Sequence, residues 1–233
     1  MSRIFDFIKE LVYPPKCIEC GALTNHDMCL CPSCLDKWEE ERRRRCNKCG
    51  RIHRECSCPI SDSTSRLFGV FHLAEYEKGT VTSDLVYKIK DGRHTPVNCF
   101  LARQLYEMLK DRADFNEAVI TYVPRSRDAI KRYGSDQAML LARELARLSE
   151  KELLCLITRK GGGAQKDMNF AERRRNVRRS YFINEENAHL IEGKRIFVVD
   201  DIITTGSTVS YIADLLLDTG ARSVSAVSVA RRT

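Results

Sequence analysis

Residues 195–218 combine an apolar strand pattern, two adjacent acids, a short polar turn and a helical pattern. The apolar run Arg195–Val199 predicts a strand that stops at Asp200 and Asp201. Apolar residues then recur at helical spacing between Val209 and Asp218. In open α/β sheets ligands bind at the carboxyl ends of the strands, so the polar turn after this strand is the first place to expect a site.

The turn has the composition of a phosphate site. A helix N-terminus offers unpaired N–H groups and the positive end of a dipole to an anion. A glycine lets the backbone approach the ligand, and hydroxyls add donors; here the residues are Thr204, Thr205, Gly206, Ser207 and Thr208. Paired carboxylates accept hydrogen bonds from vicinal sugar hydroxyls, or they contact these hydroxyls through a shared Mg²⁺ ion. The segment predicts a sugar-phosphate site; the plain alternative is a strand ending in acids with Ser207 or Thr208 as an ordinary helix N-cap.

The same ordered string resembles the phosphoribosyl-pyrophosphate (PRPP) signature of type I phosphoribosyltransferases. The resemblance implies that Asp200 and Asp201 form the catalytic pair that holds the ribose hydroxyls. It also implies that the turn Thr204–Thr208 binds the 5′-phosphate, with Mg²⁺ bound together with PRPP.

Nine of the eleven cysteines lie between Cys17 and Cys58, mostly as closely spaced pairs. No secretory signal is recognisable in residues 1–12, so the pattern favours metal ligation over disulfides and a cytoplasmic protein without membrane insertion. The pairs Cys17/Cys20 and Cys31/Cys34 have zinc-ribbon spacing, and Gly21 suits the tight turn after the first pair. We expect a structural Zn²⁺ there, because four thiolates leave no open coordination position.

A second set, Cys46, Cys49, Cys56 and Cys58, is less regular because its last two members are one residue apart. Either His53 or Cys29 could replace a ligand, and a cluster without metal is the alternative. We predict an N-terminal module over residues 1–62 that metal binding stabilises. The charged run Glu39–Arg45 that links the two ribbons predicts a solvated helix with ion pairs Glu39–Arg43 and Glu40–Arg44.

Residues 63–233 alternate strand and helix patterns, which predicts a parallel-dominated α/β sheet with flanking helices. The expected strands are 67–76, 118–123, 153–157, 180–183, 195–199 and 223–229, and the expected helices are 79–89, 97–109, 136–148 and 209–218. Cys99 and Cys155 lie alone in apolar surroundings and are expected to be buried core thiols.

The order of motifs over the whole chain resembles the ComF family, which is associated with competence. The motifs are the cysteine ribbons, Val123-Pro124-Arg125, the string from Lys131 to Gln137, Ala171–Asn176 and the signature; Ser135 stands where the family usually has an aromatic residue. The resemblance implies a double zinc ribbon joined to a type I phosphoribosyltransferase fold. It also implies a link to DNA uptake, with single-stranded DNA and other competence proteins as candidate partners.

Residues 159–179 carry eight Lys and Arg residues against Asp167 and Glu172, although the whole chain has a net charge of only +7. They include Gly161-Gly162-Gly163 followed by Arg173, Arg174 and Arg175. Type I phosphoribosyltransferases carry a flexible loop at this place, so these arginines and Arg125 are candidates for binding pyrophosphate. A nucleic-acid-binding loop and a solvated helix are the alternatives.

Two classes of function remain open. One is an enzyme that transfers phosphoribose from PRPP to an acceptor, in competence or in nucleotide metabolism; no acceptor pocket is recognisable. The other is a protein that binds PRPP without turnover and handles single-stranded DNA. The sequence favours the enzyme.

Overall fold

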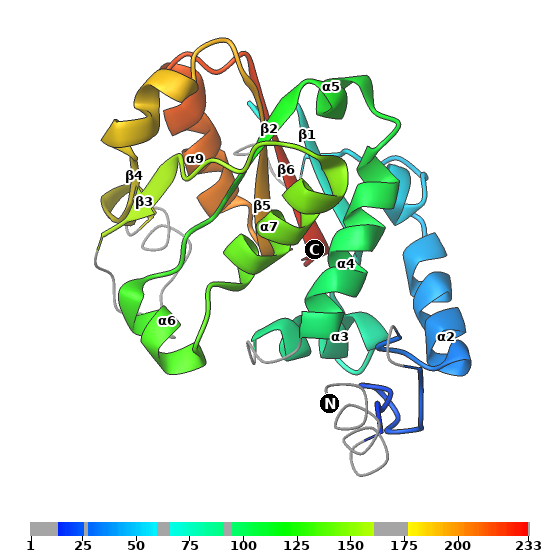
Figure 1. Cartoon of the computed structure of the whole chain (residues 1–233). Helices are drawn as coiled ribbons and strands as arrows, with labels where there is room; N and C mark the ends of the chain where they lie inside the picture. The colour runs from blue at the N-terminus through cyan, green and yellow to red at the C-terminus, as the bar shows by residue number, and fades with distance from the viewer. Residues whose placement is uncertain (1–13, 26–27, 60–65, 91–94, 161–176, 233) are drawn as a thin grey trace.

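The computed structural model describes residues 14–25, 28–59, 66–90, 95–160 and 177–232. A four-stranded parallel sheet with the order β1-β6-β5-β2 lies at its centre, and β3 and β4 form a separate antiparallel pair (Figure 1). The prediction of a parallel-dominated α/β sheet is confirmed. The elements are α2 (Pro32–Arg43), η1 (His53–Glu55), β1 (Gly69–Glu75), α3 (Val81–Lys90), α4 (Thr95–Leu109), α5 (Ala113–Asn116), β2 (Ala118–Tyr122), α6 (Arg127–Tyr133), α7 (Gln137–Ser149), β3 (Ile157–Arg159), β4 (Tyr181–Ile183), η3 (Glu185–Leu190), β5 (Arg195–Ile203), α9 (Ser207–Asp218) and β6 (Ser223–Arg231).

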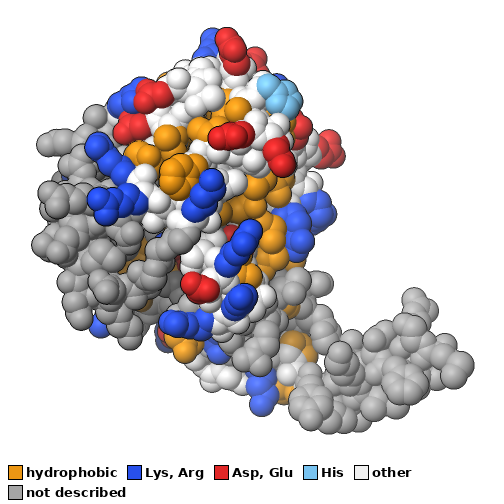
Figure 2. Space-filling model, turned by 90° about the vertical axis from the view of Figure 1, so that its left-hand side faces the viewer, with side chains coloured by type: hydrophobic (Ala, Val, Ile, Leu, Met, Phe, Trp, Pro, Cys, Tyr) orange, Lys and Arg blue, Asp and Glu red, His pale blue; other side chains and the backbone are white. Residues whose placement is uncertain are grey.

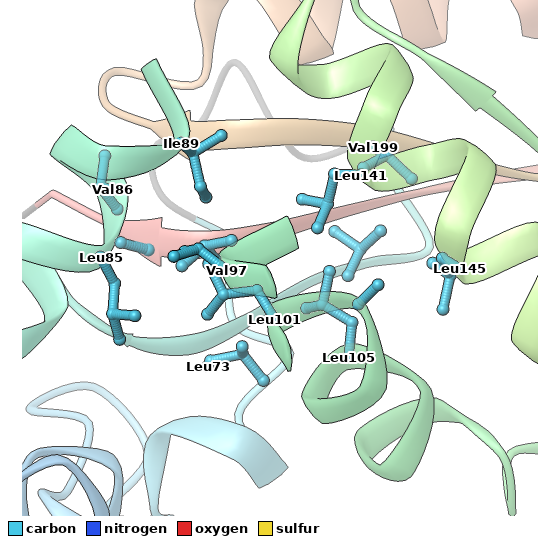
Figure 3. Close-up of a cluster of buried hydrophobic side chains, with 14 of the residues drawn as sticks. Leu73, Leu85, Val86, Ile89, Val97, Leu101, Leu105, Leu141, Leu145 and Val199 are labelled. Atoms are coloured by element: carbon cyan, nitrogen blue, oxygen red, sulfur yellow. The ribbon is translucent and has the colours of Figure 1, made fainter. Parts of the chain in front are cut away.

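The sheet is buried on both faces, as parallel sheets are. Alternate side chains of β5 point to opposite faces, so Phe197 and Val199 join one hydrophobic cluster while Ile196 and Val198 join the other. Helices α3, α4 and α7 cover the first face, and Figure 3 shows their leucines and valines gathered over Leu73 and Val199. Helix α9 covers the second face.

Strand β5 is longer than the sequence pattern predicted. It continues through the two acids to Ile203, because β6 supplies parallel partners as far as Arg231. The predicted strand 153–157 is also displaced: Leu153 makes only a bridge to Ile120, and β3 begins at Ile157. Main-chain hydrogen bonding to β2 ends after Leu154, so the chain leaves the sheet there.

The cysteine-rich segment packs directly on the sheet. The Glu41 carboxylate accepts hydrogen bonds of 2.9 Å from the backbone N–H groups of Val81 and Thr82, and so caps the start of α3. The amide of Val70 in edge strand β1 donates to the carbonyl of Ser57 at 3.4 Å. The predicted domain boundary between residues 62 and 63 lies outside the described residues.

The predicted ion pairs on α2 are wrong. The helix ends at Arg43, and Arg42 is buried instead of solvated. Its Nη1 lies 2.6 Å from Glu39 Oε1 and 2.7 Å from Gln104 Oε1 of α4, while Arg44 pairs with Glu77. Packing of this helix face against α4 determines which charges meet.

The two isolated thiols are not core residues. Cys155 is exposed and Cys99 is half-buried, so the prediction that both are buried is wrong. The apolar neighbours of each in sequence point into the core while the thiol points away.

Within the described residues, no helix combines the length and the apolar character needed to span a membrane.

Candidate functional site

The polar turn after β5 lines an open hollow of about 220 Å³, a volume that includes space open to solvent. Five of the residues that line it are the predicted phosphate-binding residues Thr204, Thr205, Gly206, Ser207 and Thr208, together with Asp200 and the apolar Ile202, Ile203 and Val209. The structure therefore gathers the acid, the hydroxyls and the helix N-terminus around one space. The three apolar residues that complete the lining were not singled out from the sequence, because they look like ordinary strand and helix residues.

The turn has the geometry of an anion cradle. Gly206 is the N-cap of α9 with φ of +75°, a conformation that favours glycine. Because Gly206 occupies the N-cap position and the helix begins at Ser207, the alternative that Ser207 or Thr208 is an ordinary N-cap is wrong. Thr205 Oγ1 lies 2.9 Å from Ser207 Oγ, and Ser210 Oγ donates to the Gly206 carbonyl at 2.8 Å. These bonds hold the hydroxyls and the first N–H groups of α9 at the rim of the hollow.

The two acids differ in their surroundings. Asp200 lines the hollow, and its Oδ1 accepts a hydrogen bond of 2.9 Å from the Asp201 amide. Asp201 is buried, and its Oδ1 accepts a hydrogen bond of 2.8 Å from the Ile202 amide. Its Oδ2 lies 3.2 Å from Arg125 Nη2. Burial, and then the charge of Asp201, raise the pKa of Asp200 well above its usual range. A cation bound beside Asp200 would relieve this repulsion.

Arg125 is held in place by a residue to which the sequence analysis gave no role. Asp136 Oδ2 accepts a hydrogen bond of 2.8 Å from the Arg125 backbone N–H, while its Oδ1 caps α7 through Met139 N at 3.3 Å. Burial raises the pKa of Asp136, against these two backbone donors. The available signal was its position directly before the helical pattern of α7, which is typical of an N-cap.

The other predicted pyrophosphate-binding residues, Arg173, Arg174 and Arg175, lie outside the described residues. On either side of them, the β3–β4 pair carries basic side chains beside aromatic rings. The Arg159 guanidinium lies 5.1 Å from the Tyr181 ring centre, and the Lys160 ammonium lies 5.4 Å from that of Phe182. Figure 2 shows Lys and Arg side chains spread over this side of the molecule, beside apolar patches.

Two groups of four cysteines are the candidate metal sites. The sulfur atoms of Cys17, Cys20, Cys31 and Cys34 lie within 4.8 Å of one another, and so do those of Cys46, Cys49, Cys56 and Cys58. The structure thus brings together the eight predicted ligands. His53 and Cys29, the alternatives, belong to neither group, and His53 Nδ1 instead lies 3.0 Å from His72 Nε2.

The geometry fits a tetrahedral ion. Cys20 Sγ lies 3.7 Å from Cys31 Sγ, and Cys49 Sγ lies 3.7 Å from Cys56 Sγ. With Zn–S bonds of about 2.3 Å, the edge of a sulfur tetrahedron is about 3.8 Å. These sulfur spacings fit one Zn²⁺ in each cluster.

One thiol in each cluster is disposed to ionise, as ligation requires. Burial alone raises the pKa of Cys46, but the backbone N–H groups of Cys49 and Lys48 and the Arg231 side chain outweigh it and bring the pKa to about 6. Burial opposes ionisation of Cys17 too, and backbone N–H groups, led by that of Cys20, bring its pKa to about 6. Thiolates are the form that binds metal.

The family model described as "Phosphoribosyl transferase domain" matches residues 129–233, which contain the whole hollow. Among solved structures, the chain is similar to a glutamine PRPP amidotransferase from B. subtilis, with 22% identity and a TM-score of 0.39. That similarity covers 56% of this chain and 25% of the other, so the chain spans about a quarter of that protein's length.

Three curated relatives match over most of the chain or of their own length. Competence protein ComFC of Streptococcus pneumoniae is 26% identical over 230 residues, 93% of this chain and 100% of the relative. DNA utilization protein YhgH of Escherichia coli is 27% identical over 214 residues, 89% and 86% respectively. Competence protein F of Haemophilus influenzae is 30% identical over 156 residues, 64% and 67%. With the phosphoribosyltransferase domain and the two cysteine clusters, these matches place the chain in the ComF family.

Proposed function

We propose that this protein binds PRPP together with Mg²⁺ in the hollow at the end of β5. The observation that carries the proposal is that Asp200 and the N-terminus of α9 line the same space of about 220 Å³. An acid and an anion cradle on one small space match a ligand with both sugar hydroxyls and a phosphate.

Each group has a distinct part in this proposal. The N–H groups and hydroxyls from Thr204 to Thr208 hold the 5′-phosphate, and Asp200 and Asp201 orient the ribose hydroxyls. Arg125, held by Asp136 and 3.2 Å from Asp201, offers a cation beside the ribose for the pyrophosphate. Mg²⁺ would supply charge that offsets the two acids and the pyrophosphate.

Calorimetric titration of PRPP with Mg²⁺ tests the proposal. The double variant Asp200→Asn/Asp201→Asn is expected to abolish binding, because it removes the Asp200 carboxylate that lines the hollow and the adjacent Asp201 carboxylate that pairs with Arg125. The matched control is Asp214→Asn/Asp218→Asn, which removes two carboxylates of α9 that pair with Arg66 outside the hollow. Metal analysis first confirms equal zinc content in all samples. Equal PRPP affinity in wild type and the first variant would contradict the proposal.

We propose phosphoribosyl transfer as the activity of this site. The reaction would displace pyrophosphate from ribose C1 by a nitrogen nucleophile, and it needs positioned acids and cations but no nucleophilic side chain. Pyrophosphate release in a screen of nitrogen-containing acceptors is the readout. PRPP binding without release for any acceptor would favour the binding protein over the enzyme.

A second candidate, single-stranded DNA binding, rests on the basic side chains around the β3–β4 pair. Lys160, Arg178 and Arg179 are exposed around the β3–β4 pair, and Phe182 is 39% exposed beside Lys160. Cations beside an exposed ring are what a single strand requires. Trp38 and Tyr181, by contrast, are buried and offer no stacking surface. The names of the relatives point to DNA and competence.

Fluorescence anisotropy with a labelled oligonucleotide tests the second candidate. Replacing Lys160, Arg178 and Arg179 by Gln is expected to weaken binding and to lower the salt slope by about 2, since each phosphate contact in a single strand contributes about 0.7. Exposed Lys131 and Arg132 of α6, changed to Gln, form the control. An unchanged slope in the triple variant would exclude this surface.

A further inference from the structure

Arg231, the last residue of β6, is a buried arginine beside the second cysteine cluster. It is 2% exposed, and its Nη2 donates to Cys46 Sγ at 3.7 Å. Its Nε and Nη1 atoms make no hydrogen bond to any residue that the structure describes. A guanidinium stays charged in proteins, so burying one is unfavourable unless an anion lies close by.

A metal-loaded cluster would be that anion. Four thiolates around one Zn²⁺ carry a formal charge of two negative units, and N–H donors to the sulfurs stabilise such a centre. Glu75, which pairs with Arg231 in the β1–β6 register, has its Oε2 3.7 Å from His53 Nε2, and a neutral cluster of four thiols would add no further negative charge beside Arg231. The position of Arg231 is thus explained by a filled second site.

The first cluster has a different positive group. Cys31 is the N-cap of α2 and Cys34 lies in its first turn, so the positive end of that helix faces the first cluster. Cys46 and Cys49 precede η1, which has only three residues, and no comparable helix begins among the four cysteines of the second cluster within the described chain. Arg231 supplies there the charge that α2 supplies at the first cluster.

Arg231 also connects the second cluster with strand β5. It pairs with Ile203 in the parallel register of β5 and β6, and the Arg232 amide donates to the Ile203 carbonyl at 2.9 Å. Ile203 is the last residue of β5 and lines the hollow. The contacts Cys46–Arg231 and Arg231–Ile203 therefore connect the second cluster with the residue that directly precedes the turn Thr204–Thr208.

We propose that Arg231 is the outer-shell partner of a Zn²⁺ ion held by Cys46, Cys49, Cys56 and Cys58, and that this ion fixes the end of β6 against β5. Arg231 is a positioning residue: it contacts the ligand Cys46 and acts on the turn through Ile203. The first cluster does not share this role.

Chelator competition that resolves the release of each of the two zinc ions tests whether Arg231 stabilises the ion of the second cluster. Arg231→Met is expected to weaken retention of one ion by about 10–100-fold, the usual effect of losing an outer-shell partner, and to leave the other unchanged. Arg231→Lys retains the charge and is expected to restore part of the loss. The control is Arg232→Met, at the exposed residue that directly follows the strand. Equal affinity of both ions in Arg231→Met and wild type would overturn the proposal.

Hydrogen exchange measured by mass spectrometry tests the second half without altering Arg231. Cys49→Ser and Cys20→Ser change one exposed ligand of the second and the first cluster respectively. Faster exchange in peptides covering residues 202–206 and 228–232 is expected for Cys49→Ser only. Equal exchange in the two variants would contradict a specific connection between the second cluster and β5. This experiment does not depend on the folding of Arg231→Met.

Discussion

The carboxylate of Asp136 joins the Arg125 backbone to the start of α7: one oxygen accepts from Arg125 N at 2.8 Å and the other from Met139 N at 3.3 Å. Arg125 in turn reaches Asp201. One buried side chain therefore sets the place of a cation at the proposed site.

Two substitutions at Asp136 separate its two hydrogen bonds. Asp136→Ala loses both and is expected to destabilise the protein by about 0.5–2 kcal/mol, as loss of an N-cap does. Asp136→Asn retains an oxygen that accepts from Met139 N, so it should destabilise the protein less. Its N–H₂ group faces the Arg125 amide and cannot accept from it, so Arg125 loses its support and PRPP affinity should fall. Urea unfolding and calorimetry measure the two effects. Undiminished PRPP affinity in both variants would show that Arg125 needs no such support.

The raised pKa of Asp200 predicts an unusual pH dependence of stability. Because the folded protein holds this proton more tightly than the unfolded chain, the carboxyl group destabilises the fold as pH rises through the window above its ordinary pKa of 3.8. Asp200→Asn removes that effect and is expected to raise Tm at pH 7, by about 2–4 °C for each kcal/mol gained.

The gain should shrink as pH falls toward the ordinary pKa of 3.8 and vanish below it, where the wild-type carboxyl is protonated in both states. Thermal unfolding of both proteins between pH 4 and 7.5 tests the prediction. A constant Tm difference across this range, or a lower Tm for the variant at pH 7, would contradict it.

Metal content should follow the two cysteine clusters. Replacing Cys20 or Cys49 by Ser is expected to remove one zinc ion per chain in each case, because each thiol belongs to a different group of four. Cys29→Ser is the matched control, since Cys29 is a buried cysteine outside both groups. Metal analysis of the purified proteins gives the stoichiometry; loss of zinc from the Cys29 variant would overturn the ligand assignment.

Trp38 provides a direct report on the cysteine-rich segment. It is the only tryptophan of the chain, fully buried, with its ring 5.0 Å from that of Phe100 and 4.7 Å from the Arg42 guanidinium. Chelation is expected to shift its emission to longer wavelength, because α2 begins at the first cluster and loses its anchor with the metal.

The shift should coincide with release of zinc and reverse when zinc is added back. An unshifted emission after complete removal of zinc would show that packing of Trp38 on Phe100 holds α2 without metal.

The parallel sheet and the signature turn could be predicted because their information is local. Periodic apolar residues define each strand and helix, and the turn residues of the hollow are consecutive in the chain. The same holds for the cysteine pairs, whose spacing alone groups Cys17 with Cys20 and Cys46 with Cys49. The extension of β5 to Ile203 was missed because it depends on the length of its partner β6.

The contacts that sequence could not supply are those between distant segments. Arg42 was assigned to solvent because its neighbours are charged, yet Gln104 and Trp38 enclose it. Arg231 shows no motif, and only the fold brings it to Cys46, 185 residues earlier. Cys155 lies in the continuous apolar run Leu153–Ile157, which predicts burial, but which side chains of this run face the core depends on where the chain leaves the sheet.

A crystal structure of the zinc-loaded protein with PRPP and Mg²⁺ would test the central claim most directly. The account predicts the 5′-phosphate about 2.7–3.2 Å from N–H and hydroxyl groups between Thr204 and Thr208, with the ribose hydroxyls facing Asp200 and Asp201. PRPP bound elsewhere, with this hollow open to solvent, would contradict it.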